Sequence, residues 1–185
     1  MSRNYKIAES GYPYFVTYTV IEWIDLFIRN VYREVFLDSV RYCQQEKGLV
    51  VYAWVIMPSH IHMILGSNGK MPLEGIIRDN KSFVSREIRK LLESSEESFE
   101  SRKSWMYHMM QSAGIRNPNN NDFQLWMQHN QPIELNTNYL MDQKLNYIHN
   151  NPVEAGFVSN PEDWLYGSAI DYAGGKGFLD IEFLE

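Results

Sequence analysis

Two apolar runs joined by one turn constrain the fold of this chain more than any other feature of its sequence. Leu49 to Met57 is almost continuously apolar, as expected of a strand that is buried on both faces. Met57-Pro58-Ser59 has turn chemistry, and the alternation of side chains resumes from His60 to Leu65. We therefore predict an antiparallel hairpin at the centre of a sheet.

Periodic segments flank this hairpin on both sides. They predict, in chain order, a strand over Tyr14–Val20, a helix over Ile24–Gln45, the hairpin, a helix over Leu73–Leu92, a strand over Phe123–Leu135, a helix over Tyr139–Asn150 capped by Asn138, and a short extended piece at Phe157-Val158. The order β-α-β-β-α-β predicts a ferredoxin-like (RRM-like) α+β fold, in which an antiparallel sheet carries its helices on one face and a further C-terminal helix follows.

The 185 residues fit one domain spanning 1–185. The segment from about 93 to 122 is rich in Ser, Glu and Asn, so we expect a flexible loop insertion there. Cys43 is the only cysteine, which excludes a disulfide framework and a cysteine-based zinc site within one chain. Because no run of 18 apolar residues occurs, we expect no membrane association and a cytoplasmic protein.

The charge is unevenly distributed along the chain. The net charge is −6, and residues 117–185 hold ten acidic and two basic side chains, which argues against a phosphate-rich partner at that end. The second predicted helix, in contrast, has a basic side, so any nucleic acid would have to bind in the middle of the chain; the alternative is that the acidic end is a plain solvated surface. The candidate DNA-binding residues of this helix are Arg78, Lys81, Arg86, Arg89 and Lys90, with Arg102 and Lys103 beyond it.

His60-Ile61-His62 is the first candidate for chemistry. Residues two apart on a strand point to the same face, so the two imidazoles lie side by side and are suited to hold one divalent cation. The alternative is two half-buried polar residues beside a turn. The motif is weak by itself, because short histidine motifs also arise by chance.

Tyr147 and Asn151 form the second candidate. They are four residues apart, so on a helix they share a face. A phenol can act as the nucleophile in phosphoryl transfer when a metal polarises the phosphate, and an amide oxygen is a hard ligand that completes a site begun by two histidines. Against this stand the usual packing role of helical tyrosines and the proline after Asn151, which disfavours helical backbone at that position.

The remaining histidines and the search for a phosphate-binding loop give little evidence of function. His149, His108 and His129 have no partner at a telling spacing and are interpreted as bystanders. No G-x-x-x-x-G-K-[ST] loop occurs, so no nucleotide cofactor is expected.

The combination of the two candidates is more specific than either. The run from Met57 to Leu65, followed about 85 residues later by the run from Tyr147 to Val158, resembles the single-tyrosine HUH transposases, and more narrowly the REP-associated tyrosine transposases. Supporting matches are Phe123 to Gln128, Pro132-Ile133, and Asp163 to Ala169 with Tyr172. The resemblance extends from about Tyr14 to Tyr172.

The resemblance implies a role for each site residue. His60 and His62 would bind Mg²⁺ or Mn²⁺, and Asn151 would be the third metal ligand. Tyr147 would attack a DNA phosphate and keep the 5′ end as a phosphotyrosine, leaving a free 3′-hydroxyl. The substrate would be single-stranded DNA carrying a hairpin flanked by a short guide sequence.

Two departures and two alternatives accompany this hypothesis. The chain is acidic where the family's DNA-binding faces are usually basic, and Gly167 stands where a serine is common. The alternatives are a module of the same fold that binds structured nucleic acid without cutting it, and a phosphoesterase in which the histidines activate water. Relatives occur as dimers and as monomers; the long segment after Pro152 could cover a dimer surface, which favours a monomer here.

Overall fold

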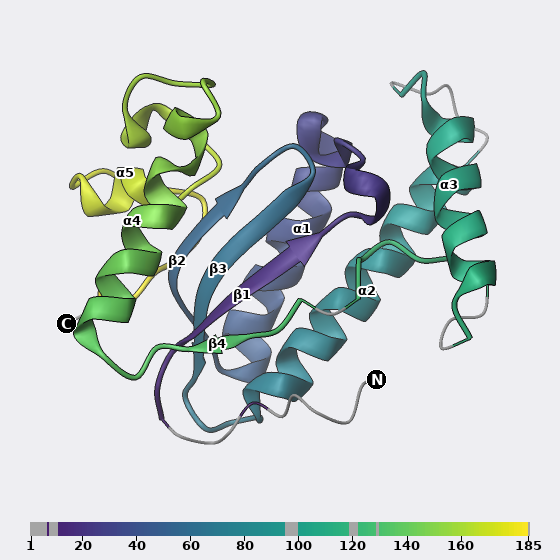
Figure 1. Ribbon diagram of the computed structural model, residues 1–185. Coiled ribbons are helices and arrows are strands. Elements are labelled where there is room, and N and C mark those ends of the chain that lie inside the picture. Colours follow the sequence, from purple (N-terminus) through teal and green to yellow (C-terminus); the bar gives the residue numbers. More distant parts are fainter. Residues whose placement is uncertain (1–6, 8–10, 95–99, 119–121, 129, 185) are drawn as a thin grey trace.

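The computed structural model describes residue 7 and residues 11–94, 100–118, 122–128 and 130–184. A central antiparallel sheet has α1 and α2 on one face and α4 on the other (Figure 1). The strands are β1 (Tyr14–Thr19), β2 (Leu49–Ile56), β3 (His60–Ser67) and β4 (Ile133–Glu134). The helices are α1 (Asn30–Tyr42), α2 (Leu73–Glu93), α3 (Lys103–Arg116), α4 (Asn138–Glu154) and α5 (Ala169–Tyr172).

The strand order is β2-β3-β1-β4. Strand β3 pairs antiparallel with both β1 and β2, so β1 and β2 run parallel to each other on either side of it. The connection from β1 through α1 to β2 therefore passes over β3, which is the split βαβ arrangement of the ferredoxin-like fold. The predicted α+β ferredoxin-like fold and the central hairpin are confirmed.

Alternation along the strands divides the interior into two apolar layers. Val16 and Tyr18 of β1, with Ile61 and Met63 of β3, are buried in the larger layer against α1 and α2. The alternating residues Phe15 of β1 and Ile64 of β3 point to the opposite face of the sheet. There they form a smaller layer with Leu135 and Ile148 beneath α4. The smaller layer fixes α4 on the sheet face that carries His60 and His62.

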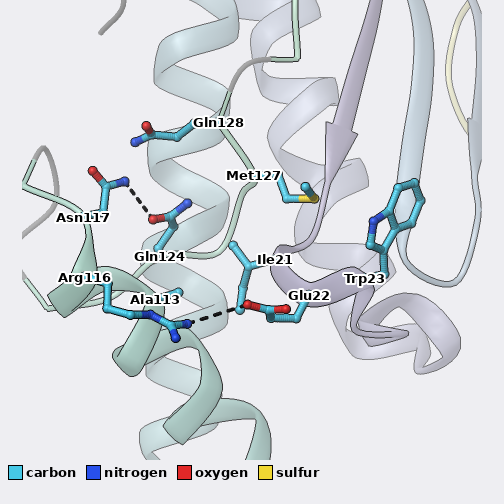
Figure 2. Close-up of a pocket in the computed structure, with 9 residues that line it drawn as sticks. All are labelled: Ile21, Glu22, Trp23, Ala113, Arg116, Asn117, Gln124, Met127 and Gln128. Atoms are coloured by element: carbon cyan, nitrogen blue, oxygen red, sulfur yellow. Dashed lines mark hydrogen bonds and ion pairs between the residues drawn. The ribbon is translucent and has the colours of Figure 1, made fainter.

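The predicted helix from Ile24 to Gln45 is wrong at its start. Two short 3-10 turns (Ile21–Trp23 and Leu26–Ile28) precede α1, and Glu22 and Trp23 have φ values of 53° and 54° in the left-handed region. Ile24 and Phe27 are buried by these turns, so their helix-like spacing reflects the packing of an irregular segment. Figure 2 shows the first turn, which an ion pair between Glu22 and Arg116 joins to α3 at 3.6 Å.

The prediction of a loop insertion from about 93 to 122 is also wrong at its centre, which α3 occupies. The buried residues of α3 recur every four positions at Met106, Met110 and Gly114, which is the packed side of a helix. A Cβ on Gly114 would lie 2.2 Å from the backbone nitrogen of Phe123, so only glycine allows this close approach. Residues 95–99 and 119–121 of the predicted insertion lie outside the described residues.

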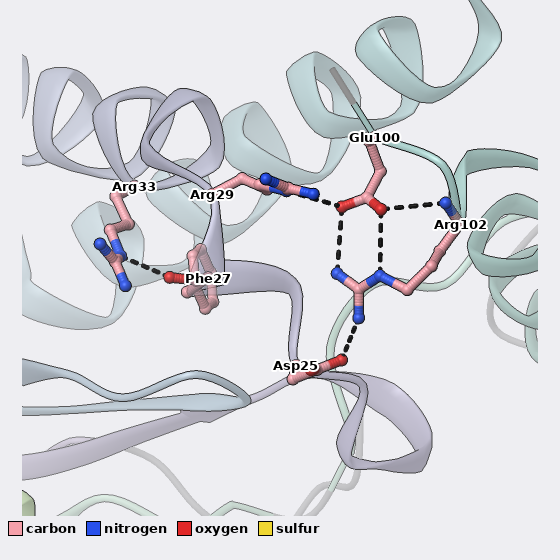
Figure 3. A network of polar contacts seen from close by, with 6 residues as sticks. All are labelled: Asp25, Phe27, Arg29, Arg33, Glu100 and Arg102. Atoms are coloured by element: carbon pink, nitrogen blue, oxygen red, sulfur yellow. Dashed lines mark hydrogen bonds and ion pairs between the residues drawn. The ribbon is translucent and has the colours of Figure 1, made fainter. Parts of the chain in front are cut away.

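A network of charged side chains attaches the start of α3 to the turns before α1 (Figure 3). The carboxylate of Glu100 is 1% exposed and accepts a hydrogen bond from Arg102 Nε at 3.0 Å. Arg29 lies 3.8 Å from the same carboxylate, and Arg102 also pairs with Asp25. The two arginines offset the cost of burying the charge of the Glu100 carboxylate. Because that carboxylate is buried, the loss of one arginine would leave its charge poorly compensated.

The predicted strand over Phe123–Leu135 is wrong except at its end, where β4 pairs with Tyr14 and Phe15. Leu125 and Trp126 are adjacent and both buried, a pattern that a strand with one exposed face does not show. Before β4, the described part of this segment forms an isolated bridge from Trp126 to Val20 in place of a strand.

Helix α4 is longer than predicted. Its cap is Thr137, whose hydroxyl accepts from the Leu140 amide at 3.3 Å, and not the predicted Asn138. Pro152 lies inside the last turn, the helix ends at Glu154, and Gly156, with a φ of 75°, follows the C-terminal cap Ala155. Phe157 donates its amide to the Pro152 carbonyl at 2.9 Å, so the extended piece predicted at Phe157-Val158 is absent.

The segment after α4 returns along β2, the outermost strand of the sheet on that side. The Ile56 amide donates to the Tyr166 carbonyl at 2.8 Å, and the Glu182 amide donates to the Val51 carbonyl at 2.9 Å. A Cβ on Gly167 would lie 3.3 Å from the Trp54 carbonyl oxygen, so the close contact with β2 explains a glycine at this position. Among the residues described, no helix has the length and hydrophobicity needed to cross a bilayer.

Candidate active site

The structure brings four of the predicted site residues together on the sheet face beneath α4. The imidazole centroids of His60 and His62 on β3 are 4.8 Å apart. The hydroxyl of Tyr147 on α4 lies 3.3 Å from His62 Nε2, and the Asn151 side chain hydrogen-bonds to His60. The phenol and the amide from the helix thus meet the imidazole pair from the strand within one chain.

Regular backbone geometry accounts for this arrangement. His60 and His62 alternate with buried Ile61, so both rings leave the strand on the same side. Tyr147 and Asn151 stay one helical turn apart because α4 continues through Pro152 to Glu154. Ile148, fully buried under the same helix, sets its rotation on the sheet and leaves Tyr147 40% exposed.

Hydroxyl groups hold the far side of each imidazole. Thr17 Oγ1 lies 2.9 Å from His62 Nδ1, and Ser59 Oγ lies 3.2 Å from His60 Nδ1. Phe15 also stacks on the His62 ring, with centroids 5.3 Å apart. When Nδ1 is engaged in this way, Nε2 is the nitrogen that faces the common centre, and its ring is fixed in orientation.

Burial sets the charge of the two histidines. It lowers the pKa of His60 below its ordinary value and lowers the pKa of His62 to about 3, with the neighbouring His60 and Lys144 adding to the effect on His62. Both rings are therefore neutral near pH 7, which is the form of imidazole that binds a cation.

Lys144 is a site residue that the sequence reasoning missed. Its ammonium lies 5.6 Å from the centroid of the Tyr147 ring and 4.8 Å from that of Phe15. The sequence signal is its position three residues before Tyr147, in a region where the only other basic residue is Lys176. Lys144 gives the centre a positive charge that can approach a phosphate.

The donor set fits a divalent cation and would leave coordination positions open to another ligand. His60, His62 and Asn151 offer two imidazole nitrogens and an amide oxygen. These ligands have a lower affinity for Mg²⁺ or Mn²⁺ than carboxylates would have. No group of three or more His, Cys, Asp or Glu side chains suited to a metal occurs among the described residues. All three donors are neutral, so a cation held here would retain its charge for an anionic ligand.

The basic residues predicted to contact DNA lie elsewhere. They belong to α2, which covers the opposite face of the sheet (Figure 1). Arg86 is exposed, and three others are already paired with carboxylates. These pairs are Arg78 with Asp79 at 3.4 Å, Arg89 with Asp122 at 2.7 Å, and Lys90 with Glu87 at 2.7 Å.

Lys81 differs from the other cations of α2. Its ammonium lies 4.9 Å from the centroid of the Tyr18 ring, on the side of the helix that faces the sheet. Burial lowers the pKa of Lys81 to about 8. The structure therefore places this lysine among apolar side chains.

The remaining histidines do not join the centre. His149 Nε2 lies 3.0 Å from Ser168 Oγ, and the ring packs edge-on against Tyr172. Burial lowers the pKa of His149 to about 4, as expected of a packed, neutral ring. His108 is exposed on α3, and His129 lies outside the described residues.

The chain is similar to known transposases in sequence and in fold. A family model described as "Transposase IS200 like" matches residues 18–114. A solved structure of a REP-associated tyrosine transposase bound to a REP hairpin superimposes with a TM-score of 0.63 at 16% identity, covering 100% of this chain and 94% of that one. A transposase structure from Deinococcus radiodurans R1 gives a TM-score of 0.41 at 16% identity, covering 78% of this chain and 95% of that one. No curated protein matches the sequence.

Proposed function

Because the chain belongs to the IS200-like transposase family, we propose that it cuts single-stranded DNA and transfers the cut strand, with Tyr147 as the nucleophile. One observation carries the proposal: the Tyr147 hydroxyl lies 3.3 Å from His62 Nε2, beside a second imidazole and an amide. A partly exposed phenol next to such a group of donors is suited to attack a phosphate that approaches from solvent.

The reaction conserves one phosphodiester-like bond. The Tyr147 oxygen forms a bond to phosphorus, the bond from phosphorus to the 3′-oxygen breaks, the phenol loses its proton and the 3′-oxygen gains one. The 5′ end remains on the protein as a phosphotyrosine. Attack by the 3′-hydroxyl of a second strand reverses these changes and joins that strand, so no ATP is required.

His60, His62 and Asn151 would hold Mg²⁺ or Mn²⁺. When bound, the cation would supply Lewis acidity to the non-bridging phosphate oxygens. Thr17 and Ser59 fix the imidazole orientations. Lys144 lies near enough to the phenol ring to attract the phosphate electrostatically. Since the protein donors are neutral, we expect the DNA phosphate to raise the affinity for the cation.

We propose hairpin DNA with a single-stranded flank as the substrate. The REP-associated transposase that shares this fold was solved bound to a REP hairpin. A binding mode that reads hairpin shape agrees with the net charge of −6, which gives little general attraction to DNA.

We also propose that one chain forms a complete, monomeric active site. All four central residues come from a single chain. The segments around Tyr166 and Glu182 hydrogen-bond to the outer edge of β2. They cover the edge at which a strand of a second chain would otherwise pair with the sheet.

The test is a covalent adduct assay with hairpin oligonucleotides and Mn²⁺. We expect an SDS-stable protein–DNA adduct that Tyr147→Phe abolishes and that EDTA prevents. Tyr139→Phe is the matched control, since Tyr139 is an exposed tyrosine on the same helix. An adduct with Tyr147→Phe would refute the nucleophile. EDTA-resistant binding with no adduct would indicate a binding module, and release of both DNA ends would indicate a phosphoesterase.

A further inference from the structure

A cavity of about 390 Å³ opens between the turn Ile21–Trp23 and α3 (Figure 2). Its lining residue Trp23 also contacts the candidate active site. The Trp23 indole is 59% exposed and packs edge-on against His60, with centroids 5.5 Å apart. In Figure 2 the indole lies on the opposite side of Met127 from the amide side chains of the cavity. One wall of the cavity therefore adjoins a residue of the catalytic centre.

The backbone at this edge is held in an unfavourable conformation. Glu22 and Trp23 are consecutive non-glycine residues in the left-handed region, a costly arrangement that persists only where its surroundings enforce it. Here the Ile21 amide donates to the Leu125 carbonyl at 2.9 Å, and the Glu22 carboxylate pairs with Arg116. The result is a large aromatic ring presented to solvent beside His60.

The polar groups of the cavity suit a base better than a phosphate. Arg116 is paired with Glu22, so the wall has little net positive charge. The other polar groups are the amides of Asn117, Gln124 and Gln128. Asn117 Nδ2 donates to Gln124 Oε1 at 2.8 Å, and Gln124 Nε2 donates to the Trp126 carbonyl at 2.9 Å, so Gln124 is fixed in orientation.

Amides and an exposed aromatic ring are the usual partners of a nucleobase. An amide side chain offers a donor and an acceptor to a base edge, and an aromatic ring stacks on the base face. Met127 adds an apolar surface between the two. Only an unpaired base can reach such a site, because a base within a duplex has both faces stacked.

We propose that this cavity binds an unpaired nucleobase of the strand adjoining the scissile phosphate, with Trp23 as the stacking platform and the amides of Gln124 and Gln128 at the base edge. The inference rests on the proposed function, since it takes the phosphate beside His60 as the point from which the strand continues. Trp23 is a positioning residue in this scheme: it fixes which phosphate lies beside Tyr147.

The experiment measures binding without cleavage. In the Tyr147→Phe background with Mn²⁺, hairpin oligonucleotides carry a single abasic site that is moved step by step along the flank. We expect one position near the scissile phosphate at which removing the base weakens binding about 10-fold or more. Trp23→Ala should weaken binding of the intact oligonucleotide by a similar factor, and should remove the penalty of the abasic site at that position alone.

Further variants separate stacking from an effect on the turn. Trp23→Gly relieves the left-handed backbone and should bind as weakly as Trp23→Ala, whereas Trp23→Phe should retain most of the affinity. Trp105→Ala removes another exposed tryptophan, on α3, and should leave the abasic profile unchanged. Gln128→Ala should reduce discrimination between bases at the same position.

The outcomes for the cavity and for the chemistry are distinguishable. A Tyr147-dependent adduct with a flat abasic profile, or with wild-type binding by Trp23→Ala, would overturn the cavity proposal and leave the proposed function intact. Absence of the adduct on every hairpin would overturn the proposed function, while the abasic profile would still decide whether the cavity holds a base. Full affinity of Trp23→Gly would assign Trp23 to the turn and refute stacking.

Discussion

Replacing Lys81 by methionine should stabilise the protein at neutral pH. The structure places the Lys81 ammonium over the Tyr18 ring, where burial lowers its pKa to about 8 from an ordinary value of 10.5. A depression of this size corresponds to a penalty of at most about 3 kcal/mol for the charged form in the folded state. Loss of the contact between the cation and the ring offsets about 1 kcal/mol of the gain. We therefore expect Lys81→Met to raise the free energy of unfolding at pH 7 by about 2 kcal/mol.

The pH dependence gives this prediction its sign. Between the folded pKa of about 8 and the unfolded value of 10.5, the unfolded chain binds more protons at Lys81, so this group makes the wild type more stable as the pH rises. Below the lower value both states are charged and the penalty is constant. The advantage of Lys81→Met should therefore shrink between pH 7 and pH 10.

Guanidinium denaturation of both proteins at pH 7 and pH 10 measures the effect, since other titrating groups cancel in the difference. Lys90→Met is the control, because its exposed side chain on the same helix should change stability by less than about 0.5 kcal/mol. A wild-type-to-variant difference that is equal at the two pH values would refute the desolvation argument. Hairpin affinity of the same variant would decide whether Lys81 also contacts phosphate, as the sequence predicted.

Three further predictions test other contacts. Lys144→Ala should slow adduct formation about 10-fold while Lys144→Arg retains most of the rate, and equal losses would show that charge is not the contribution of this residue. Arg102→Ala should lower the free energy of unfolding by about 2 to 4 kcal/mol because the buried Glu100 carboxylate loses both hydrogen bonds from the Arg102 guanidinium, and a thermal melt of the variant at pH 7 measures it. Gly114→Ala should destabilise by more than about 1 kcal/mol in a denaturant titration, because the added Cβ would lie 2.2 Å from the Phe123 nitrogen; a neutral result would mean that the two segments separate easily.

The centre of the fold could be predicted because its patterns are strict. Strands β2 and β3 are apolar enough to exclude other assignments, and α2 keeps its helical spacing along its whole length. The same regularity placed two of the candidate site residues, since the period of a strand puts His60 and His62 on one face. The spacing of four residues then joined Tyr147 to Asn151.

The failures have local causes. The start of α1 was misplaced because Glu22 and Trp23 adopt a backbone that no propensity favours, and only contacts distant in sequence enforce it. Helix α3 was missed because the polar residues around it outweighed its buried side, although Met106 and Met110 carried the helical period. Helix α4 tolerates Pro152 because the proline lies in the last turn.

Charge patterns along the sequence did not show which surface faces the candidate centre. The basic residues of α2 suggested a DNA surface, but a one-dimensional count does not show which face of the sheet a helix covers or which carboxylates neighbour it. Lys144, one of two basic residues in the acidic last third of the chain, lies nearer to the candidate centre than any of them. Its location depends on tertiary structure, so its importance emerges only with the fold.

Strand β3 occupies an interior position in the sheet, with ladders to β1 on one side and to β2 on the other. To move either imidazole by more than a rotamer change, the protein would have to break both ladders at once. The amide hydrogens of Ile61 to Leu65 should therefore exchange with solvent only on global unfolding. Losses at the periphery, such as unwinding of α3 or release of the C-terminal residues from β2, leave that strand paired. The imidazole half of the centre should thus outlast the unwinding of α3 and the loss of the proposed base-binding cavity.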